Sequence, residues 1–346
     1  MKIHVWLTTS VIVLALALAG FGAQRWAVRA PAPDAMTTAG GASGTHAAPS
    51  REELVDAYPL VPRDEIVGDT PLHKELVTEL QARYRTHLDT LRKEIASSGA
   101  RMVLVYLTPE FESDAQKAHE PFIRHLSAEM EIEYVNLSPL LQGLDPLTYT
   151  QMPRDGHWSA RGAAIVAGGL GDILLPHSAD RSADGMSAAL RPALFGDLEP
   201  GQDVILDGGK NLPYRLQTNR QGLRLDHELQ FPKTRQRVLL LGDSQIYCPF
   251  LDNSDTIGAH LQGMFPDREI VSAANLGYGL DDLESLFRER ARFIEPDLVI
   301  VQTSGGDVLD AFFSHRNLFS RTRAVFEPTA VEERFYRGLT RPSARQ

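Results

Sequence analysis

The chain has 346 residues, of which 43% are hydrophobic and 23% charged, an ordinary globular composition with ample material for a core. The formal net charge is −10, so there is no overall positive field to attract nucleic acid, and no nucleic-acid partner is expected. The single cysteine, Cys248, excludes an internal disulfide and any multi-cysteine metal site. Its simplest interpretation is a small buried hydrophobe.

The first 50 residues predict an exported protein. Residues 5–23 form one uncharged stretch whose length suits a transmembrane helix, which needs about 20 apolar residues. Ala17-Leu18-Ala19 also fits a cleavage site, so residues 1–26 are either a signal anchor or a removed signal peptide. Residues 27–50 are rich in Ala, Pro, Gly, Thr and Ser and predict a flexible linker. A linker behind the apolar stretch favours the anchor.

From residue 72 the chain alternates between helical and strand patterns. Apolar residues at steps of three and four predict a helix over 72–95, and the apolar run at 102–107 predicts a strand buried on both faces. A helix over 114–130, a strand over 133–137 and a helix over 160–175 follow. This β-α-β-α progression predicts a parallel sheet.

The second half repeats the alternation after an irregular insertion, residues 176–232. Expected here are short antiparallel strands at 203–207 and 212–218, then strands at 238–241, 269–273 and 297–302 alternating with helices at 257–265 and 280–293. Residues 311–346 predict one or two helices and a loose end. Two strands in the first half and three in the second are too few for separate α/β domains. We therefore predict one domain, residues 51–320, with a central parallel sheet of about five strands, and a tail at 321–346.

Three motifs follow predicted strands and carry the candidate chemistry. Gly242-Asp243-Ser244 ends the strand at 238–241, and open α/β sheets place their active sites at that carboxyl edge. A serine nucleophile needs a base, and His157 can supply it if a carboxylate, Asp155, orients the imidazole. The backbone N–H groups of Ser244 and Gly277, with the Asn275 side chain nearby, are candidates for an oxyanion hole.

Each motif alone has a simpler explanation. Gly-Asp-Ser is a common turn composition, and the Asp155–His157 segment is also typical of a turn with a helix cap. A metal ion on Asp155 and His157 is an alternative, but no further cluster at ligand spacing accompanies them, so neither a metal nor a cofactor is expected. The joint occurrence of the motifs at strand ends favours one site. Trp158 and Tyr247 flank two of them and are candidates for stacking on sugar rings, with buried packing as the alternative.

These residues resemble the SGNH (GDSL-type) hydrolases. Five segments resemble the amino-terminal half of an SGNH hydrolase, namely residues 214–215, 219–224, 238–244, 275–279 and 296–302. The family's Asp/His block normally lies near the carboxyl terminus, whereas the matching Asp155-Gly156-His157-Trp158 lies in front of Ser244. This permuted order, with an exported amino terminus, is similar to the alginate O-acetyltransferase-like branch. One departure is Gly306, which stands where the family's third block usually has an oxyanion asparagine.

The resemblance spans about residues 70–310 and implies a three-layer SGNH-like domain. It implies an exported O-acetyltransferase in which Ser244 carries the acetyl group, with a polysaccharide acceptor and a membrane-bound acyl donor protein as partners. The expected location is the periplasm, with the chain held at the inner membrane or released after cleavage. The alternatives are an SGNH esterase that uses water, and a non-catalytic glycan-binding or assembly protein.

Overall fold

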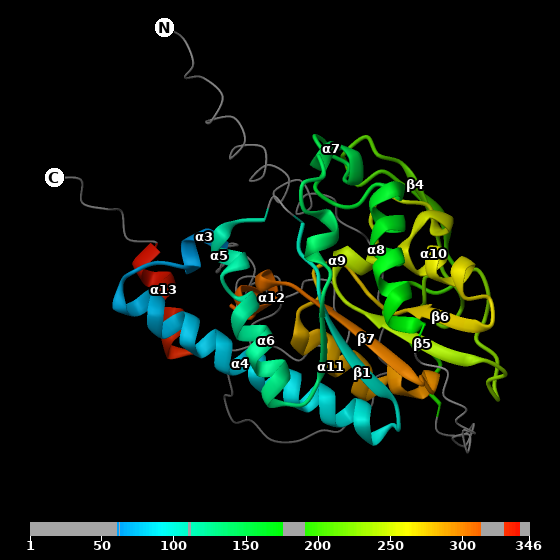
Figure 1. Cartoon of the computed structure of the whole chain (residues 1–346), viewed down its shortest axis with the longest axis horizontal. Coiled ribbons are helices and arrows are strands. Elements are labelled where there is room, and N and C mark those ends of the chain that lie inside the picture. Colours follow the sequence, from blue (N-terminus) through cyan, green and yellow to red (C-terminus); the bar gives the residue numbers. More distant parts are fainter. Residues whose placement is uncertain (1–60, 62, 110–111, 176–190, 313–328, 340–346) are drawn as a thin grey trace, which may run out of the picture.

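The computed structural model describes residues 61, 63–109, 112–175, 191–312 and 329–339 (Figure 1). The predicted anchor and linker lie outside the described residues. Within the described part, no helix combines the length and the apolar character needed to span a bilayer.

A five-stranded, all-parallel sheet forms the centre of the molecule. Its strand order is β2-β1-β7-β5-β6. The strands are β1 (Arg101–Tyr106), β2 (Glu133–Asn136), β5 (Gln236–Leu241), β6 (Arg268–Ser272) and β7 (Leu298–Thr303). Because β1 pairs with β7, the two halves of the chain contribute to one sheet, which confirms the prediction of an α/β fold built from both.

Helices cover both faces of the sheet (Figure 1). One face carries α4 (Pro71–Ser97), α6 (Glu120–Glu129) and α11 (Leu280–Glu289), and the other carries α8 (Ala160–Leu174) and α10 (Ile257–Met264). Two further helices extend the first layer, α12 (Gly305–Asp310) directly after β7 and α13 (Ala330–Leu339) packed on α4. Shorter helical turns connect them, namely α3 (Arg63–Ile66), α5 (Asp114–Lys117), η1 (Ser138–Leu141), α7 (Pro146–Tyr149), α9 (Ser244–Tyr247), η3 (Asn253–Asp255) and η4 (Ala291–Ile294).

The strands alternate their side chains between two cores. Along β5, Leu239 and Leu241 enter the core under α4 and α11, while Val238 and Leu240 enter the core under α8 and α10. Because both faces are covered, such strands are apolar throughout, which is why the sequence shows them as continuous hydrophobic runs.

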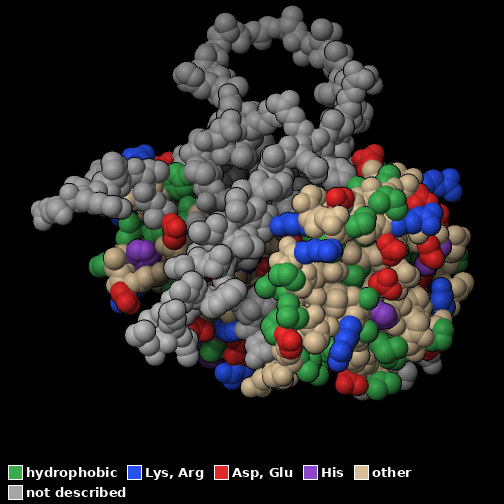
Figure 2. Space-filling view, turned by 90° about the horizontal axis from the view of Figure 1, so that it is seen from above, with side chains coloured by type: hydrophobic (Ala, Val, Ile, Leu, Met, Phe, Trp, Pro, Cys, Tyr) green, Lys and Arg blue, Asp and Glu red, His purple; other side chains and the backbone are tan. Residues whose placement is uncertain are grey.

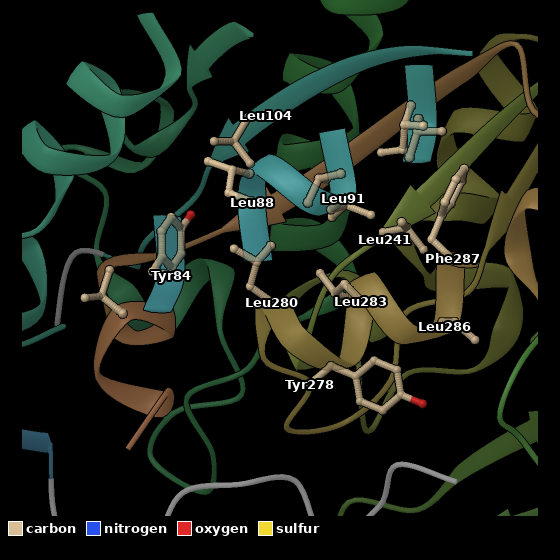
Figure 3. Close-up of a cluster of buried hydrophobic side chains, with 14 of the residues drawn as sticks. Tyr84, Leu88, Leu91, Leu104, Leu241, Tyr278, Leu280, Leu283, Leu286 and Phe287 are labelled. Carbon is tan, nitrogen blue, oxygen red and sulfur yellow. The ribbon is translucent and has the colours of Figure 1, made fainter. Parts of the chain in front are cut away.

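The longest helix, α4, confirms its predicted stripe. Its buried residues are Leu76, Leu80, Tyr84, Leu88, Leu91 and Ile95. Figure 3 shows Leu88 and Leu91 facing Leu280 and Leu283 of α11, beside the sheet residue Leu241. Thr70 caps the helix by accepting a hydrogen bond from the His73 N–H, and Pro71 starts its first turn, where a missing N–H costs nothing.

Two expectations about the helices need correction. The helix predicted over 114–130 is two helices, α5 and α6, broken at Ala118–His119. The reason is Pro121, which lacks an N–H and fits only the first turn of α6. The second correction is an omission, because no helix was expected at α12, which begins directly after β7.

The irregular insertion contains the predicted antiparallel pair. Strands β3 (Asp203–Leu206) and β4 (Tyr214–Gln217) form a separate two-stranded sheet.

Basic and acidic side chains of the described residues are interspersed on the face seen in Figure 2.

Candidate active site

Ser244 lies at the carboxyl edge of the central sheet, directly after β5. It is the first residue of the single-turn helix α9, and the Asp243 carboxylate caps that turn by accepting a hydrogen bond from the Gln245 N–H at 2.7 Å. Gly242 makes the turn sterically feasible, because a Cβ there would lie 2.6 Å from Gln302 Oε1. The serine is therefore presented on a short, tightly packed turn.

Three segments from elsewhere in the chain each hydrogen-bond to this turn. The Trp158 indole N–H donates to the Gln245 carbonyl at 2.8 Å, which joins the Asp155–Trp158 segment to the nucleophile segment. The Asn275 N–H donates to the Gly242 carbonyl at 3.3 Å, which brings in the loop after β6. The Asp243 N–H donates to Gln302 Oε1 at 3.2 Å, which ties in the end of β7. The segments that the sequence predicted to form one site thus surround one turn.

His157 and Asp155 form a pair in the loop before α8. Their contact runs from His157 Nδ1 to Asp155 Oδ1, and the same oxygen accepts the His157 backbone N–H at 2.9 Å. Burial raises the pKa of Asp155, but the hydrogen bond and charge of His157, with Lys210, outweigh it and lower that pKa below its ordinary value. Ser159 caps α8 two residues later, which fixes the loop. The pairing leaves His157 Nε2 as the nitrogen able to act on a substrate or a serine.

Within the described part of the chain, the candidate nucleophile and the two backbone donors have no competing partners. Ser244 is partly exposed, and no described residue hydrogen-bonds to its hydroxyl. The backbone N–H groups of Ser244 and Gly277 likewise lack an acceptor among the described residues. The Asn275 side chain is committed to its own loop, since its Oδ1 accepts the Leu276 N–H at 2.8 Å and its Nδ2 contacts the Tyr278 hydroxyl at 3.5 Å.

Trp158 and Tyr247 are packing residues, which corrects the idea that their rings stack on sugars. Trp158 is fully buried and Tyr247 is 4% exposed. Both lie in the apolar core under α8 and α10, together with Cys248. Burial raises the pKa of the Cys248 thiol to about 11, which fits the small-hydrophobe interpretation. The polar edge of Trp158 still serves the site through its bond to the turn.

A buried arginine from the insertion, Arg224, holds the chain that follows Ser244, and sequence reasoning gave it no individual role. Its guanidinium donates to the carbonyls of Tyr247 at 2.6 Å and Cys248 at 3.1 Å, and to the carbonyl of Leu251. Cys248 and Phe250 both have positive φ angles, which non-glycine residues adopt only when their surroundings impose it. The Phe250 ring then lies 6.2 Å, centroid to centroid, from the His157 ring.

Carboxyl groups gather behind the nucleophile turn. Burial raises the pKa of Glu112 to about 7, and burial together with repulsion from neighbouring carboxylates raises the pKa values of Asp243 and Asp307 well above the usual range. The charge of Arg63, which is paired with Asp310 at 2.5 Å, acts in the opposite direction on all three. The edge of the sheet that presents Ser244 is therefore the place where buried carboxyl groups keep protons near neutral pH.

No metal-ligand cluster competes with this site in the described part of the chain. No three His, Cys, Asp or Glu side chains of the described residues are arranged to hold a metal ion. Two shallow hollows of about 360 and 210 Å³ lie away from Ser244, one at the amino ends of β1 and β2 and one in the insertion around Asn219.

No family model and no curated protein matches the chain. Some solved structures are distantly similar to the chain in fold. The O-acetyltransferase domain of Pseudomonas putida AlgJ is 15% identical with a TM-score of 0.46, over 71% of this chain and 88% of that one. Pseudomonas aeruginosa AlgX is 15% identical with a TM-score of 0.35, over 68% of this chain and 63% of that one. At these values the likenesses do not indicate which reaction this chain performs.

Proposed function

We propose that this protein is an O-acyltransferase that carries an acyl group on Ser244, with His157 as general base and Asp155 as its orienting carboxylate. The observation that carries the proposal is the hydrogen bond from the Trp158 indole to the Gln245 carbonyl. It fixes the residue after His157 to the residue after Ser244, although the two segments are about 90 positions apart. A serine, an imidazole and a carboxylate at one sheet edge are the parts that acyl transfer requires.

In the first half-reaction, Ser244 Oγ attacks the carbonyl carbon of an ester, and its proton moves to His157 Nε2. The Asp155 carboxylate stabilises the resulting imidazolium through Nδ1. The unpartnered N–H groups of Ser244 and Gly277 are available to the oxyanion of the tetrahedral intermediate. Collapse breaks the ester C–O bond, the leaving oxygen takes the proton from His157, and the acyl group remains on Ser244.

In the second half-reaction, a hydroxyl of the acceptor gives its proton to His157 Nε2 and attacks the acyl carbon. Collapse of the second intermediate releases Ser244, which recovers its proton from His157. Water in place of the acceptor would give hydrolysis by the same steps. Transfer therefore depends on an acceptor that occupies the site better than water does.

We further propose an acetyl group as the acyl group and a cell-surface or secreted glycan as the acceptor. The support is the order of the motifs, with Asp155 and His157 in front of Ser244, which resembles the acetyltransferase-like branch of the SGNH hydrolases. The amino-terminal sequence supports export and a periplasmic location, and the resemblance supports a membrane-bound acyl donor.

The test incubates the full chain with 4-nitrophenyl acetate, with and without a series of oligosaccharide acceptors, and analyses protein and products by mass spectrometry. We expect an acetyl group on Ser244 and acetylated oligosaccharide with at least one acceptor. Free acetate alone with every acceptor would replace the transferase by an esterase. Folded protein that neither turns over the ester nor reacts with a fluorophosphonate probe would overturn both enzymatic functions in favour of a binding or assembly role.

A further inference from the structure

Two hydrogen-bond donors that have no acceptor among the described residues converge over Gly306, at the edge of the sheet that presents Ser244. A Cβ built on Gly306 would lie 3.0 Å from Arg63 Cζ, 3.2 Å from Arg63 Nη1 and 3.1 Å from Gln116 Nε2. The guanidinium and the carboxamide thus occupy the space in which a side chain at position 306 would begin. They reach it from α3 and α5, two short helices outside the strand framework.

Two nitrogen atoms of the Arg63 guanidinium are held by Asp310, and the third has no acceptor among the described residues. Arg63 Nε donates to Asp310 Oδ1 at 2.7 Å and Nη2 donates to Asp310 Oδ2 at 2.5 Å, a two-point pair that fixes the plane of the group. Nη1, the nitrogen nearest Gly306, has no acceptor among the described residues. The Arg63 side chain keeps 37% of its surface exposed, so this edge is open to a ligand.

The carboxamide is fixed in the same way. Gln116 Oε1 accepts from the Ser113 N–H at 3.2 Å and from the Ser113 hydroxyl at 3.1 Å, so the other amide atom must be the donor Nε2. Gln116 is 8% exposed, and no described residue accepts from its Nε2. A fixed amide donor from which no described residue accepts is available to an acceptor atom on a ligand.

Gly306 and its neighbour make this arrangement sterically feasible. A Cβ on Gly305 would lie 1.7 Å from the Gln116 carbonyl, so α5 packs directly against the start of α12. Strand β7, which precedes α12, is paired with β5, and Gln302 at its end bonds to the Asp243 N–H. Gly306 and Ser244 therefore follow neighbouring strands, which puts the donor pair over Gly306 at the same edge of the sheet as Ser244.

We propose that Arg63 Nη1 and Gln116 Nε2 form a subsite that binds an uncharged oxygen atom of the substrate, either the ester carbonyl or an acceptor hydroxyl. An uncharged oxygen fits better than a carboxylate because Asp310 already balances Arg63, and Glu112, Asp243 and Asp307 crowd the same edge. The inference rests on the proposed function and adds the residues that position its substrate.

The experiment compares Arg63→Gln, Arg63→Lys, Gln116→Ala and Gly306→Ala in the full chain with the wild type. The control is Arg220→Gln, which removes an 85% exposed arginine with a surface partner. Three rates are measured, namely Ser244 labelling by a fluorophosphonate, kcat and KM for 4-nitrophenyl acetate alone, and acetyl transfer to a neutral oligosaccharide. Thermal unfolding of each variant checks the fold.

We expect about tenfold losses in the Arg63→Gln and Gln116→Ala variants, the effect of one lost hydrogen bond of about 1.4 kcal/mol. Gly306→Ala should lose at least as much, because its methyl group enters between the two donors. Arg63→Lys keeps the charge beside Asp310 but lacks the second nitrogen, so it should restore thermal stability without restoring the rate.

The step that is impaired identifies the oxygen. Slower labelling and ester turnover without an acceptor assign the subsite to the ester carbonyl, whereas slower transfer alone assigns it to the acceptor hydroxyl. Two outcomes would refute the subsite while the proposed function stands, provided that wild-type Ser244 is labelled. In one, the variants stay within twofold of Arg220→Gln in every rate. In the other, Arg63→Lys restores full activity. If wild-type Ser244 does not react at all, the proposed function fails and the subsite fails with it.

Discussion

The two edges of the central sheet carry charged residues in opposite ways. At the amino edge, the fully buried Arg237 pairs with Glu269 and also donates to the carbonyls of Ile294 and Gln230. At the carboxyl edge, Glu112, Asp243 and Asp307 are crowded around Arg63, which is already paired with Asp310. Buried polar atoms there, among them Gln302 Nε2 and Gln245 Oε1, have no hydrogen-bond partner in the described part.

The difference indicates that the amino edge of the sheet contributes mainly to stability and the carboxyl edge mainly to function. A buried charge is tolerated when hydrogen bonds and a counter-charge satisfy it, as at Arg237. Carboxyl groups forced together and donors left unpaired cost stability, and such costs are characteristic of sites that bind or react. We therefore expect substitutions at the amino edge to change the free energy of unfolding, and substitutions at the carboxyl edge to change reactivity.

The largest expected effect is that of Ser244→Ala. Fluorophosphonate labelling and ester turnover should fall to background, a loss of about 10⁴-fold or more, because the acyl carrier is gone. The free energy of unfolding should stay within about 0.5 kcal/mol of the wild type, since the hydroxyl makes no hydrogen bond to any described residue. Ser254→Ala, at an exposed serine ten positions later, is the matched control. Persistent labelling of Ser244→Ala would place the nucleophile elsewhere.

Asp155→Asn should lower the acylation rate by about 10²–10⁴-fold, because an amide can leave the imidazole in the wrong tautomer. The measurement is the pH dependence of kcat/KM for 4-nitrophenyl acetate, with the exposed Asp114→Asn as control. An unchanged profile in Asp155→Asn would mean that the His157–Asp155 contact only shapes the loop.

Glu269→Gln tests the amino edge. It leaves the buried Arg237 charge without its carboxylate and should lower the free energy of unfolding by about 3 kcal/mol, measured by urea denaturation. The labelling rate of the folded fraction should not change. Glu228→Gln removes the partner of the exposed Arg220 and should cost less than about 1 kcal/mol. A catalytic defect in stably folded Glu269→Gln would contradict the claim that the amino edge affects only stability.

Trp158→Phe should cost about 1–2 kcal/mol of stability, because the Gln245 carbonyl loses its donor while most of the ring packing is kept. It should also slow Ser244 labelling, since the bond ties the His157 loop to the nucleophile turn. A loss of stability with wild-type labelling kinetics would show that the indole only packs.

The effect of Glu112→Gln on stability should depend on pH. Because burial raises the folded-state pKa of Glu112 to about 7, its contribution to stability is fully present below its unfolded pKa of about 4.3 and is lost as pH rises through 7. The neutral glutamine has no charge to bury at any pH, so the stability of the variant relative to the wild type should rise between about pH 4 and pH 7, by about 1–3 kcal/mol at most. A difference in unfolding temperature that does not vary with pH would contradict the raised pKa.

Much of the fold could be predicted from sequence because the buried faces of its helices and strands give regular hydrophobic patterns. The stripe on α4 and the apolar run of β5 report helices and strands directly through hydrophobic periodicity. The break at Pro121 was missed because the apolar pattern continues across it, and α12 was missed because Gly305 and Gly306 are poor helix formers. In the second case tertiary packing against α5 overrides local preference.

The candidate site was only partly predictable. Ser244, His157 and Asp155 could be selected because each motif follows a recognisable strand or precedes a helix. Arg63 and Gln116 could not, because an arginine in α3 and a glutamine capping α5 carry no pattern that indicates where their nitrogen atoms point. For the ring of Trp158, sugar stacking and buried packing both stayed open, because sequence cannot distinguish a buried aromatic from an exposed one.

The sequence by itself determined the chemical groups and the strands that present them, because apolar runs and turn residues are local properties of the chain. Only the tertiary structure decided that β1 lies beside β7, so that the two halves form one sheet, and that the Trp158 indole reaches the Gln245 carbonyl. It also placed over Gly306 two donors that no described residue pairs with. The physical reason is that such contacts depend on the packing of whole elements, which brings together residues that no local pattern relates.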